Sequence, residues 1–252
     1  MVTAHDANAE GPRQRYEDRA AVSGGSGAMF DRIARRYDLL NRIMSLGLDQ
    51  SWRKKLVKAL DVDVAAKVLD VATGTADVAL AVADAYPRAR VMGIDPSVQM
   101  LDIGRDKVDA RGLENRVELR EADAQALPFE DNAFDAAVIS FGIRNVPDRQ
   151  KGIEEMARVT RPHGKVVVLE LNEPQGGIMA ALARFHVHEV VPRVGALLSG
   201  AHEYRYLQDS IEAFPQPEDF KEMMERAGLT HVRLKKLSFG AAYLFIGEVV
   251  EA

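Results

Sequence analysis

The sequence predicts an α/β fold built on an open, mostly parallel sheet. Short apolar runs alternate with helical segments through the middle of the chain, as in right-handed βαβ units. The run 67–71 contains Asp70 and leads through a small-residue turn into a helix, and the run 90–95 ends in Asp95. An acid at the end of the second strand is where such sheets hold ribose hydroxyls, so the pattern indicates a nucleoside site.

Each predicted element has a local justification. The run Val166 to Leu169 is continuously apolar, as expected of a strand buried on both faces, and Gly112, Pro162 and Gly164 mark helix ends. The turn-like residues 237–241 make the last two strands an antiparallel pair. The predicted strands are 67–71, 90–95, 116–121, 134–141, 164–171, 231–237 and 241–250, and the predicted helices are 76–85, 97–111, 149–160 and 217–227.

Three segments lie outside this alternation. Residues 1–28 are polar and rich in Gly and Ser, so we expect a disordered extension. Residues 29–60 have helical periodicity that is interrupted at Gly47. Residues 175–215 are predicted to form a helical insertion or lid within a single domain that spans 29–252.

Composition limits the classes of function. A net charge of −5 disfavours broad nucleic-acid binding, because phosphate backbones attract basic proteins. The chain has no cysteine, which excludes disulfides and Cys-based zinc sites, and it shows no ligand cluster with metal spacing. There is no secretory signal and no apolar run near the roughly 20 residues of a membrane span, so we expect a cytoplasmic protein.

The turn after the first strand favours S-adenosylmethionine over a dinucleotide. A dinucleotide fingerprint requires three glycines for close approach to a pyrophosphate, and here only Gly74 remains. S-adenosylmethionine has no phosphate. We expect Asp70 to bind the ammonium of its methionine moiety, and Thr75 with backbone N–H groups to bind the carboxylate. The alternative is that Asp70 and Gly74 only cap a helix and shape a turn.

Two further positions extend the nucleoside hypothesis. Asp95 follows Asp70 by about the offset of a ribose-binding acid, although Asp-Pro-Ser is also a good helix entry. After the third strand, Asp123 is placed to accept the adenine amine and the N–H of Ala124 to donate to a ring nitrogen. Leu127 and Phe129 either pack on adenine or belong to the core.

Four motifs carry a specific resemblance. They are V-I-S-F-G-I-R-N-V-P-D after the fourth strand, F-D-R-I-A-R-R-Y-D-L-L-N near residue 30, L-G-L-D-Q-S-W-R-K-K at 46–55 and E-Y-R-Y-L-Q-D-S-I at 203–211. With them the chain resembles the UbiE/MenG/Coq5 family, the C-methyltransferases of ubiquinone and menaquinone biosynthesis, from about Met29 to Val249.

The resemblance implies a class I S-adenosylmethionine-dependent methyltransferase fold, whose seven-stranded sheet has an antiparallel last strand. The matching cofactor positions are Thr75, Asp95, Asp123, Ala124 and Ser140. One position departs from the family, because Ala76 stands where the family turn G-T-G-D has its second glycine. If residue 76 takes a positive φ, its Cβ is strained, whereas an alanine that is already helical is harmless.

The implied reaction methylates a ring carbon of a reduced polyprenyl quinone precursor, such as demethylmenaquinol or its ubiquinone-pathway counterpart. Arg144 and Asn145 are the catalytic candidates: Arg144 to stabilise phenolate charge or orient a water, and Asn145 to hold the quinol oxygen. The alternative roles are a loop ion pair and a turn. The segment Ser140 to Ile143 differs from the Asn/Asp-Pro-Pro-Tyr/Phe pattern of amino-group methyltransferases.

Candidate substrate-binding residues lie on the N-terminal helix and in the lid. The lid is also the candidate channel for a polyprenyl tail, which makes peripheral membrane association a hypothesis. A homodimer, another phenolic or lipid-like acceptor, and a catalytically weak scaffold of a quinone-biosynthesis complex stay open as alternatives. The substrate-binding candidates are Tyr37, Asn41, His186, Arg205 and Tyr206.

Overall fold

The computed structural model describes most of the chain in two stretches, 45–172 and 209–251, together with Phe30, Asp31, Ala34, Asp38, Leu39, Asn41 and Arg42. The predicted disordered extension and residues 175–208 of the predicted lid lie outside the described residues. Residues 209–212, which the lid prediction also included, are helical.

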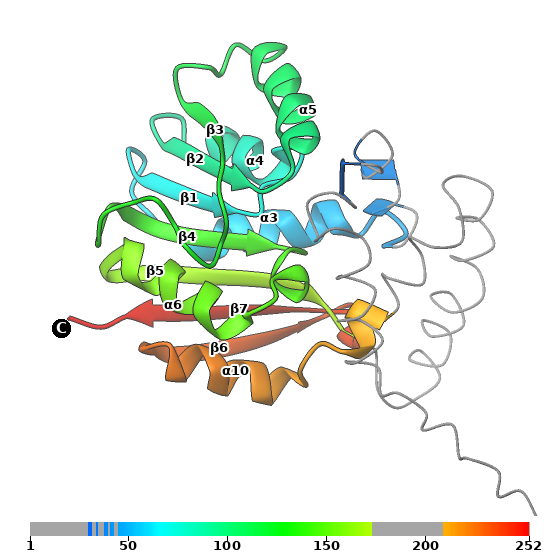
Figure 1. Cartoon of the computed structure of the whole chain (residues 1–252), viewed down its shortest axis with the longest axis vertical. Helices are drawn as coiled ribbons and strands as arrows, with labels where there is room; N and C mark the ends of the chain where they lie inside the picture. Colours follow the sequence, from blue (N-terminus) through cyan, green and yellow to red (C-terminus); the bar gives the residue numbers. More distant parts are fainter. Residues whose placement is uncertain are drawn as a thin grey trace, which may run out of the picture.

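Seven strands form one sheet in the order β3-β2-β1-β4-β5-β7-β6. Neighbouring strands are parallel except at β7, which runs antiparallel to both β5 and β6 (Figure 1). This confirms the predicted fold class and the antiparallel last strand. The strands are β1 (Lys67–Val71), β2 (Arg90–Asp95), β3 (Val117–Glu121), β4 (Phe134–Ser140), β5 (Thr160–Leu171), β6 (Leu229–Leu237) and β7 (Ala242–Val249).

Helices cover both faces of the sheet (Figure 1). On one face, α3 contacts α4 and the strands β4 and β5, while α4 and α5 both contact β2 and β3. On the other face, α6 and α10 pack together. The helix predicted after Gly47 is α3. The helices are α3 (Asp49–Leu60), α4 (Asp77–Ala85), α5 (Val98–Asp109), α6 (Arg149–Val159) and α10 (Pro217–Arg226).

The central strands are buried on both faces because their side chains alternate between two cores. In β1, Val68 belongs to the core under α3 and α4, whereas Leu69 belongs to the core under α6 and α10. Val138 and Ile139 divide in the same way in β4. This alternation fixes the register of the parallel strands, so that β1, β2 and β4 end at one edge of the sheet, where the candidate site lies.

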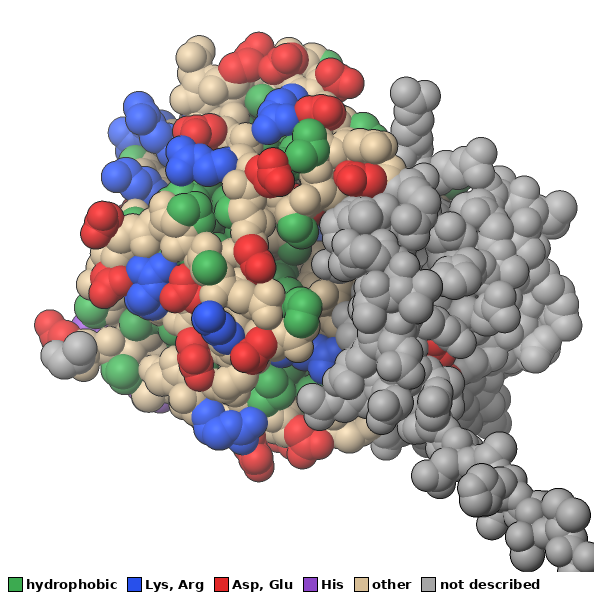
Figure 2. Space-filling model, in the orientation of Figure 1, with side chains coloured by type: hydrophobic (Ala, Val, Ile, Leu, Met, Phe, Trp, Pro, Cys, Tyr) green, Lys and Arg blue, Asp and Glu red, His purple; other side chains and the backbone are tan. Residues whose placement is uncertain are grey.

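The described surface is mixed in charge. Figure 2 shows acidic and basic side chains interspersed over one face, so neither sign dominates the part of that face that the structure describes. Within the described ranges, no helix has the length and apolar character needed to cross a membrane.

Candidate active site

The turn between β1 and α4 is a run of alternating left-handed residues. Ala72, Gly74 and Ala76 have φ values of 51°, 56° and 65°. The N–H of Thr73 donates to the carbonyl of Ile94 in β2 (2.8 Å), which ties the turn to the neighbouring strand. Of the two alternatives for Ala76, the structure has the left-handed one, in which an alanine is strained.

Asp95 anchors this turn from the end of β2. Its Oδ2 accepts from the N–H of Gly74 (2.9 Å) and its Oδ1 from the N–H of Ser97 (2.8 Å). Ser97 is the residue that caps α5, because its Oγ accepts from the N–H of Met100 (3.2 Å). Burial raises the pKa of Asp95 to about 6, although these two hydrogen bonds oppose the shift.

Asp70 lies beneath the same turn. Its carboxylate is 1% exposed and accepts from the hydroxyl of Thr73 (2.6 Å). Burial raises the pKa of Asp70 to about 7, against the lowering effect of that hydrogen bond. A carboxyl group with such a pKa gains its charge readily when a cation binds beside it.

A cleft opens beside Asp95 at the ends of β1, β2 and β4. It encloses about 590 Å³ of empty space, part of it open to solvent. Four predicted cofactor residues and the predicted catalytic Asn145 line it together. The cleft is lined by Phe30, Ala72, Gly74, Ile94, Asp95, Pro96, Met100, Ala122, Asp123, Ala124, Phe141, Gly142, Asn145, Val146 and Pro147.

The structure brings two of the residues predicted on the adenine side to the cleft. Asp123 and Ala124 line the cleft, and the Asp123 carboxylate also accepts from the N–H of Gln125 (2.8 Å). Leu127 instead packs in the core beneath α6, and Phe129 stacks edge-on against Phe134, so the core alternative holds for both. Sequence reasoning gave no site role to part of the apolar lining. Met100 belongs to none of the four motifs, and Phe30 begins one of them but was not a candidate site residue.

A second, smaller cavity adjoins the cleft at the turn, since Ala72 and Gly74 line both; it encloses about 310 Å³ of empty space, part of it open to solvent. Its other lining residues combine the predicted Asp70, Thr75 and Ser140 with Arg53, Thr73, Asp77 and Val78. The Oγ of Ser140 is buried there and has no hydrogen-bond partner among the described residues.

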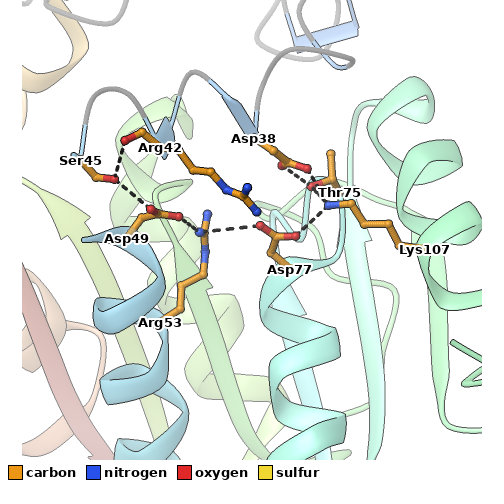
Figure 3. A network of polar contacts seen from close by, with 8 residues as sticks. All are labelled: Asp38, Arg42, Ser45, Asp49, Arg53, Thr75, Asp77 and Lys107. Carbon is orange, nitrogen blue, oxygen red and sulfur yellow. Dashed lines mark hydrogen bonds and ion pairs between the residues drawn. The ribbon is translucent and has the colours of Figure 1, made fainter. Parts of the chain in front are cut away.

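The hydroxyl of Thr75 is bound within a polar network (Figure 3). It donates to Asp38 (2.7 Å) and accepts from Lys107 (2.9 Å). The Lys107 ammonium also donates to Asp38 and Asp77, each at 2.7 Å. The network joins the N-terminal segment, the turn between β1 and α4, and α5, so Thr75 fixes this turn (the proposed cofactor turn) as well as lining the cavity.

Arg144 and Asn145 lie in a short 3-10 turn, Ile143–Asn145, after β4. Asn145 lines the cleft. Arg144 is 2% exposed, and its Nη1 donates to Glu170 (2.5 Å) and to the carbonyl of Phe141 (2.8 Å). Glu170, at the end of β5, also accepts from the N–H of Arg144 (3.2 Å). The Arg144 side chain thus forms a buried ion pair with Glu170, which is the alternative role that the sequence left open for it.

The predicted substrate residues are mostly outside the described part of the chain. Tyr37, His186, Arg205 and Tyr206 fall there. Asn41 is described: it is 7% exposed, and its Nδ2 has no partner among the described residues.

Comparison with known proteins places these features among methyltransferases. Residues 19–248 match the sequence model of the ubiE/COQ5 methyltransferase family. The chain is 46% identical over 219 residues to the ubiquinone/menaquinone biosynthesis C-methyltransferase UbiE of Syntrophotalea carbinolica, covering 87% of this chain and 92% of the relative. It is 47% identical over 221 residues to the demethylmenaquinone methyltransferase of Thermus thermophilus, covering 87% and 99%.

A solved structure agrees on the fold. An S-adenosylmethionine-dependent methyltransferase from Aquifex aeolicus superposes with a TM-score of 0.59 at 18% identity, covering 79% of this chain and 89% of that one.

Proposed function

The chain belongs to the ubiE/COQ5 methyltransferase family, and from this premise we propose that it methylates a ring carbon of a reduced polyprenyl quinone precursor. S-adenosylmethionine is the methyl donor. Demethylmenaquinol is the proposed acceptor, and the ubiquinone-pathway counterpart is the alternative within the same chemistry.

One observation carries the proposal. Asn145 lines the same cleft as Asp95 and Gly74, so the turn predicted to hold the acceptor stands beside the turn predicted to hold the donor. Both turns follow strands of one rigid sheet, β4 and β1, which pair in parallel. Such rigid placement is what an in-line transfer requires, because the acceptor carbon must approach the methyl group from the side opposite sulfur.

The cofactor supplies an electrophilic methyl group on a sulfonium. In the transfer, a carbon–carbon bond forms at the quinol ring, the carbon–sulfur bond breaks, and the ring carbon loses its proton. Ring carbon is a weak nucleophile until a phenolic proton begins to leave, so the protein must favour phenolate charge. We assign the contact with the quinol oxygen to Asn145.

Arg144 has an indirect part in this proposal. Its guanidinium is bound to Glu170 and to the carbonyl of Phe141, and Asn145 follows it directly in the chain. We assign Arg144 the role of holding the turn and of adding positive potential behind the quinol oxygen.

The remaining acceptor-side candidates come from the N-terminal segment and from the predicted lid. We propose that Tyr37, Asn41, His186, Arg205 and Tyr206 contact the quinol, and that the segment 175–215 covers its tail. A substrate of this kind resides in a membrane, so we also propose peripheral association with the inner face of the cytoplasmic membrane.

The test uses the purified full chain with S-adenosylmethionine and two reduced acceptors: a short-tailed demethylmenaquinol and a short-tailed benzoquinol precursor of ubiquinone. Mass spectrometry is expected to find one added methyl group on the naphthoquinol ring carbon. Methylation of the benzoquinol alone would move the activity to the ubiquinone pathway. A protein that binds S-adenosylhomocysteine but methylates neither acceptor would overturn the proposal.

A further inference from the structure

Arg53 is a buried cation in the wall of the smaller cavity. It lies on α3, outside the strand ends that supply most of the site, yet it lines this cavity together with Asp70 and Ser140. The residue is 8% exposed, and its guanidinium carbon lies 5.4 Å from the centre of the Phe141 ring. Phe141 lines the larger cleft, so Arg53 lines the smaller cavity and contacts a ring of the neighbouring cleft.

The contacts of Arg53 fall on one side of its guanidinium. Its Nη1 binds the buried carboxylate of Asp49 and lies 3.7 Å from Asp77 (Figure 3). Its Nε is buried and has no partner among the described residues. A buried donor without a partner is costly, so a ligand that accepts from Nε would recover that cost.

The same cavity holds a second buried donor without a described partner, the hydroxyl of Ser140, and one acid whose burial disfavours its charge, Asp70. Two donors facing an acid suit a group that carries both a carboxylate and an ammonium. The hydroxyl of Thr75, by contrast, already donates to Asp38. A carboxylate in this cavity therefore finds its donors at Arg53 and Ser140 rather than at Thr75.

We propose that Arg53 binds the α-carboxylate of the methionine end of S-adenosylmethionine through Nε, with Ser140 as the second donor and Asp70 on the ammonium. This inference rests on the proposed function only in its choice of cofactor. It gives Arg53 the task of recognising the amino-acid end, while Asp95 and Asp123 recognise the nucleoside end. Asp49 holds the guanidinium in place, since its other oxygen accepts from Ser45 (2.9 Å).

The test compares two ligands by titration calorimetry. S-adenosylhomocysteine keeps the α-carboxylate and α-ammonium, whereas 5′-methylthioadenosine lacks both. Arg53→Met is expected to weaken S-adenosylhomocysteine binding by about 10- to 100-fold, the range for a lost charge-assisted hydrogen bond, and to change 5′-methylthioadenosine binding less than about twofold. Arg53→Lys, which keeps the charge, is expected to recover part of the loss.

Two further variants keep the test decisive. Arg53→Met leaves Asp49 buried and unpaired, so the double variant Asp49→Asn/Arg53→Met is measured against Asp49→Asn alone. Lys54→Met changes the exposed neighbour on the same helix and should bind both ligands as wild type does. Equal losses for both ligands, or no loss in either Arg53 variant, would overturn the inference. Failure of the wild-type protein to bind S-adenosylhomocysteine would instead count against the proposed function.

Discussion

The carboxylate of Asp95 accepts a hydrogen bond from the N–H of Gly74 across 2.9 Å. Asp95 ends β2, whereas Gly74 lies in the turn that follows the neighbouring parallel strand β1, so the bond ties the proposed ribose-binding acid to the proposed cofactor-binding turn. Asp95 thus holds the turn in place and, in the proposed function, also binds the ribose. Removing its charge should disturb both.

Asp95→Asn is expected to weaken binding of S-adenosylhomocysteine and of 5′-methylthioadenosine alike, by about 10- to 100-fold, because both ligands keep the ribose. An amide has only one acceptor atom, so one of the two backbone N–H groups also loses its partner, and the free energy of unfolding should fall by about 1–3 kcal/mol. Calorimetry and urea unfolding measure the two effects. Asp102→Asn, on exposed α5 surface, is the matched control.

The pKa values of Asp70 and Asp95 predict how stability changes with pH. Burial raises the pKa of Asp70 to about 7 and that of Asp95 to about 6, from an unfolded value of 3.8. At a pH between 3.8 and these raised pKa values, the folded protein holds protons that the unfolded chain has released. The free energy of unfolding of the ligand-free protein should therefore fall as pH rises from about 4 to 7. Above pH 7 this contribution should be flat.

Asp70→Asn isolates the larger effect, because asparagine does not titrate. The difference in unfolding free energy between wild type and this variant should fall by a few kcal/mol from pH 4 to pH 8, at about 1.4 kcal/mol per pKa unit. Urea unfolding at several pH values measures it. A difference that is constant with pH would contradict the buried, protonated carboxyl group.

Cofactor binding should have the opposite dependence on pH. An ammonium beside Asp70 favours its charged form, so binding releases a proton, and affinity for S-adenosylhomocysteine should rise from pH 6 to pH 8, by at most about 10-fold per pH unit below the pKa. Calorimetry in buffers of different ionisation enthalpy counts the protons. Asp70→Asn should bind weakly at both pH values and release fewer protons.

The strands were predictable because their signals are local. The predicted range 90–95 is β2 itself, and the predicted 116–121 differs from β3 by one residue. The exception is β5, which begins at Thr160 rather than at 164. Pro162 and Gly164 indicate a turn, but the strand continues through them, and Thr160 still pairs with Phe134 across a register shift. Tertiary pairing overrides the local signal there.

The site was less predictable where it depends on pairs distant in sequence. Asp95 and Asp123 follow strand ends and could be placed from the pattern. Glu170 lies 26 residues from Arg144, and no local pattern links them. Arg53 lies on a helix whose periodicity indicates only an amphipathic face, so its place in the cavity became visible only in the fold.

The Arg144–Glu170 pair makes a separate prediction about catalysis. Glu170→Gln keeps an acceptor but removes the charge that holds the guanidinium, so the turn that carries Asn145 should be less well fixed. We expect kcat to fall about 10- to 100-fold in Glu170→Gln and in Arg144→Lys, while S-adenosylhomocysteine affinity stays within about threefold. Full kcat in Glu170→Gln would show that the pair does not position the turn.

Arg144→Met should instead cost about 3–5 kcal/mol of stability, because it leaves Glu170 buried and unpaired.

Lys107 links the N-terminal segment to the cofactor turn, through Asp38 and Thr75 (Figure 3). Phe30, from the same segment, lines the cleft. Lys107→Met should therefore weaken the attachment of this segment and speed dissociation of S-adenosylhomocysteine by about three- to tenfold. The expected effect is modest because the lysine is partly exposed. Stopped-flow displacement measures the rate. Arg111→Met, which removes an exposed ion pair with Asp84 beyond the end of α5, should leave the dissociation rate unchanged.

Ala76 has a φ of 65°, so the alanine does adopt the left-handed conformation that glycine usually supplies. Ala76→Gly relieves about 1–2 kcal/mol of backbone strain but loses about 0.8 kcal/mol of buried methyl group and about 0.4–1 kcal/mol through the more flexible unfolded chain. These effects nearly cancel, so we expect the thermal midpoint and the affinity for S-adenosylhomocysteine to be close to those of wild type. Ala76→Val adds a β-branched side chain at positive φ and should be clearly less stable.

The same pair of variants decides whether Ala76 weakens the enzyme. An S-adenosylhomocysteine affinity that rises tenfold or more in Ala76→Gly would mean that the alanine distorts the cofactor turn, as expected of a weak binder that acts as a scaffold. We expect no such gain, because Ala76 is fully buried and its N–H bonds to the carbonyl of Thr73 (3.0 Å), while its carbonyl accepts from the N–H of Leu80 in the first turn of α4 (2.9 Å). The turn is closed around the methyl group, so the strain is already offset by packing.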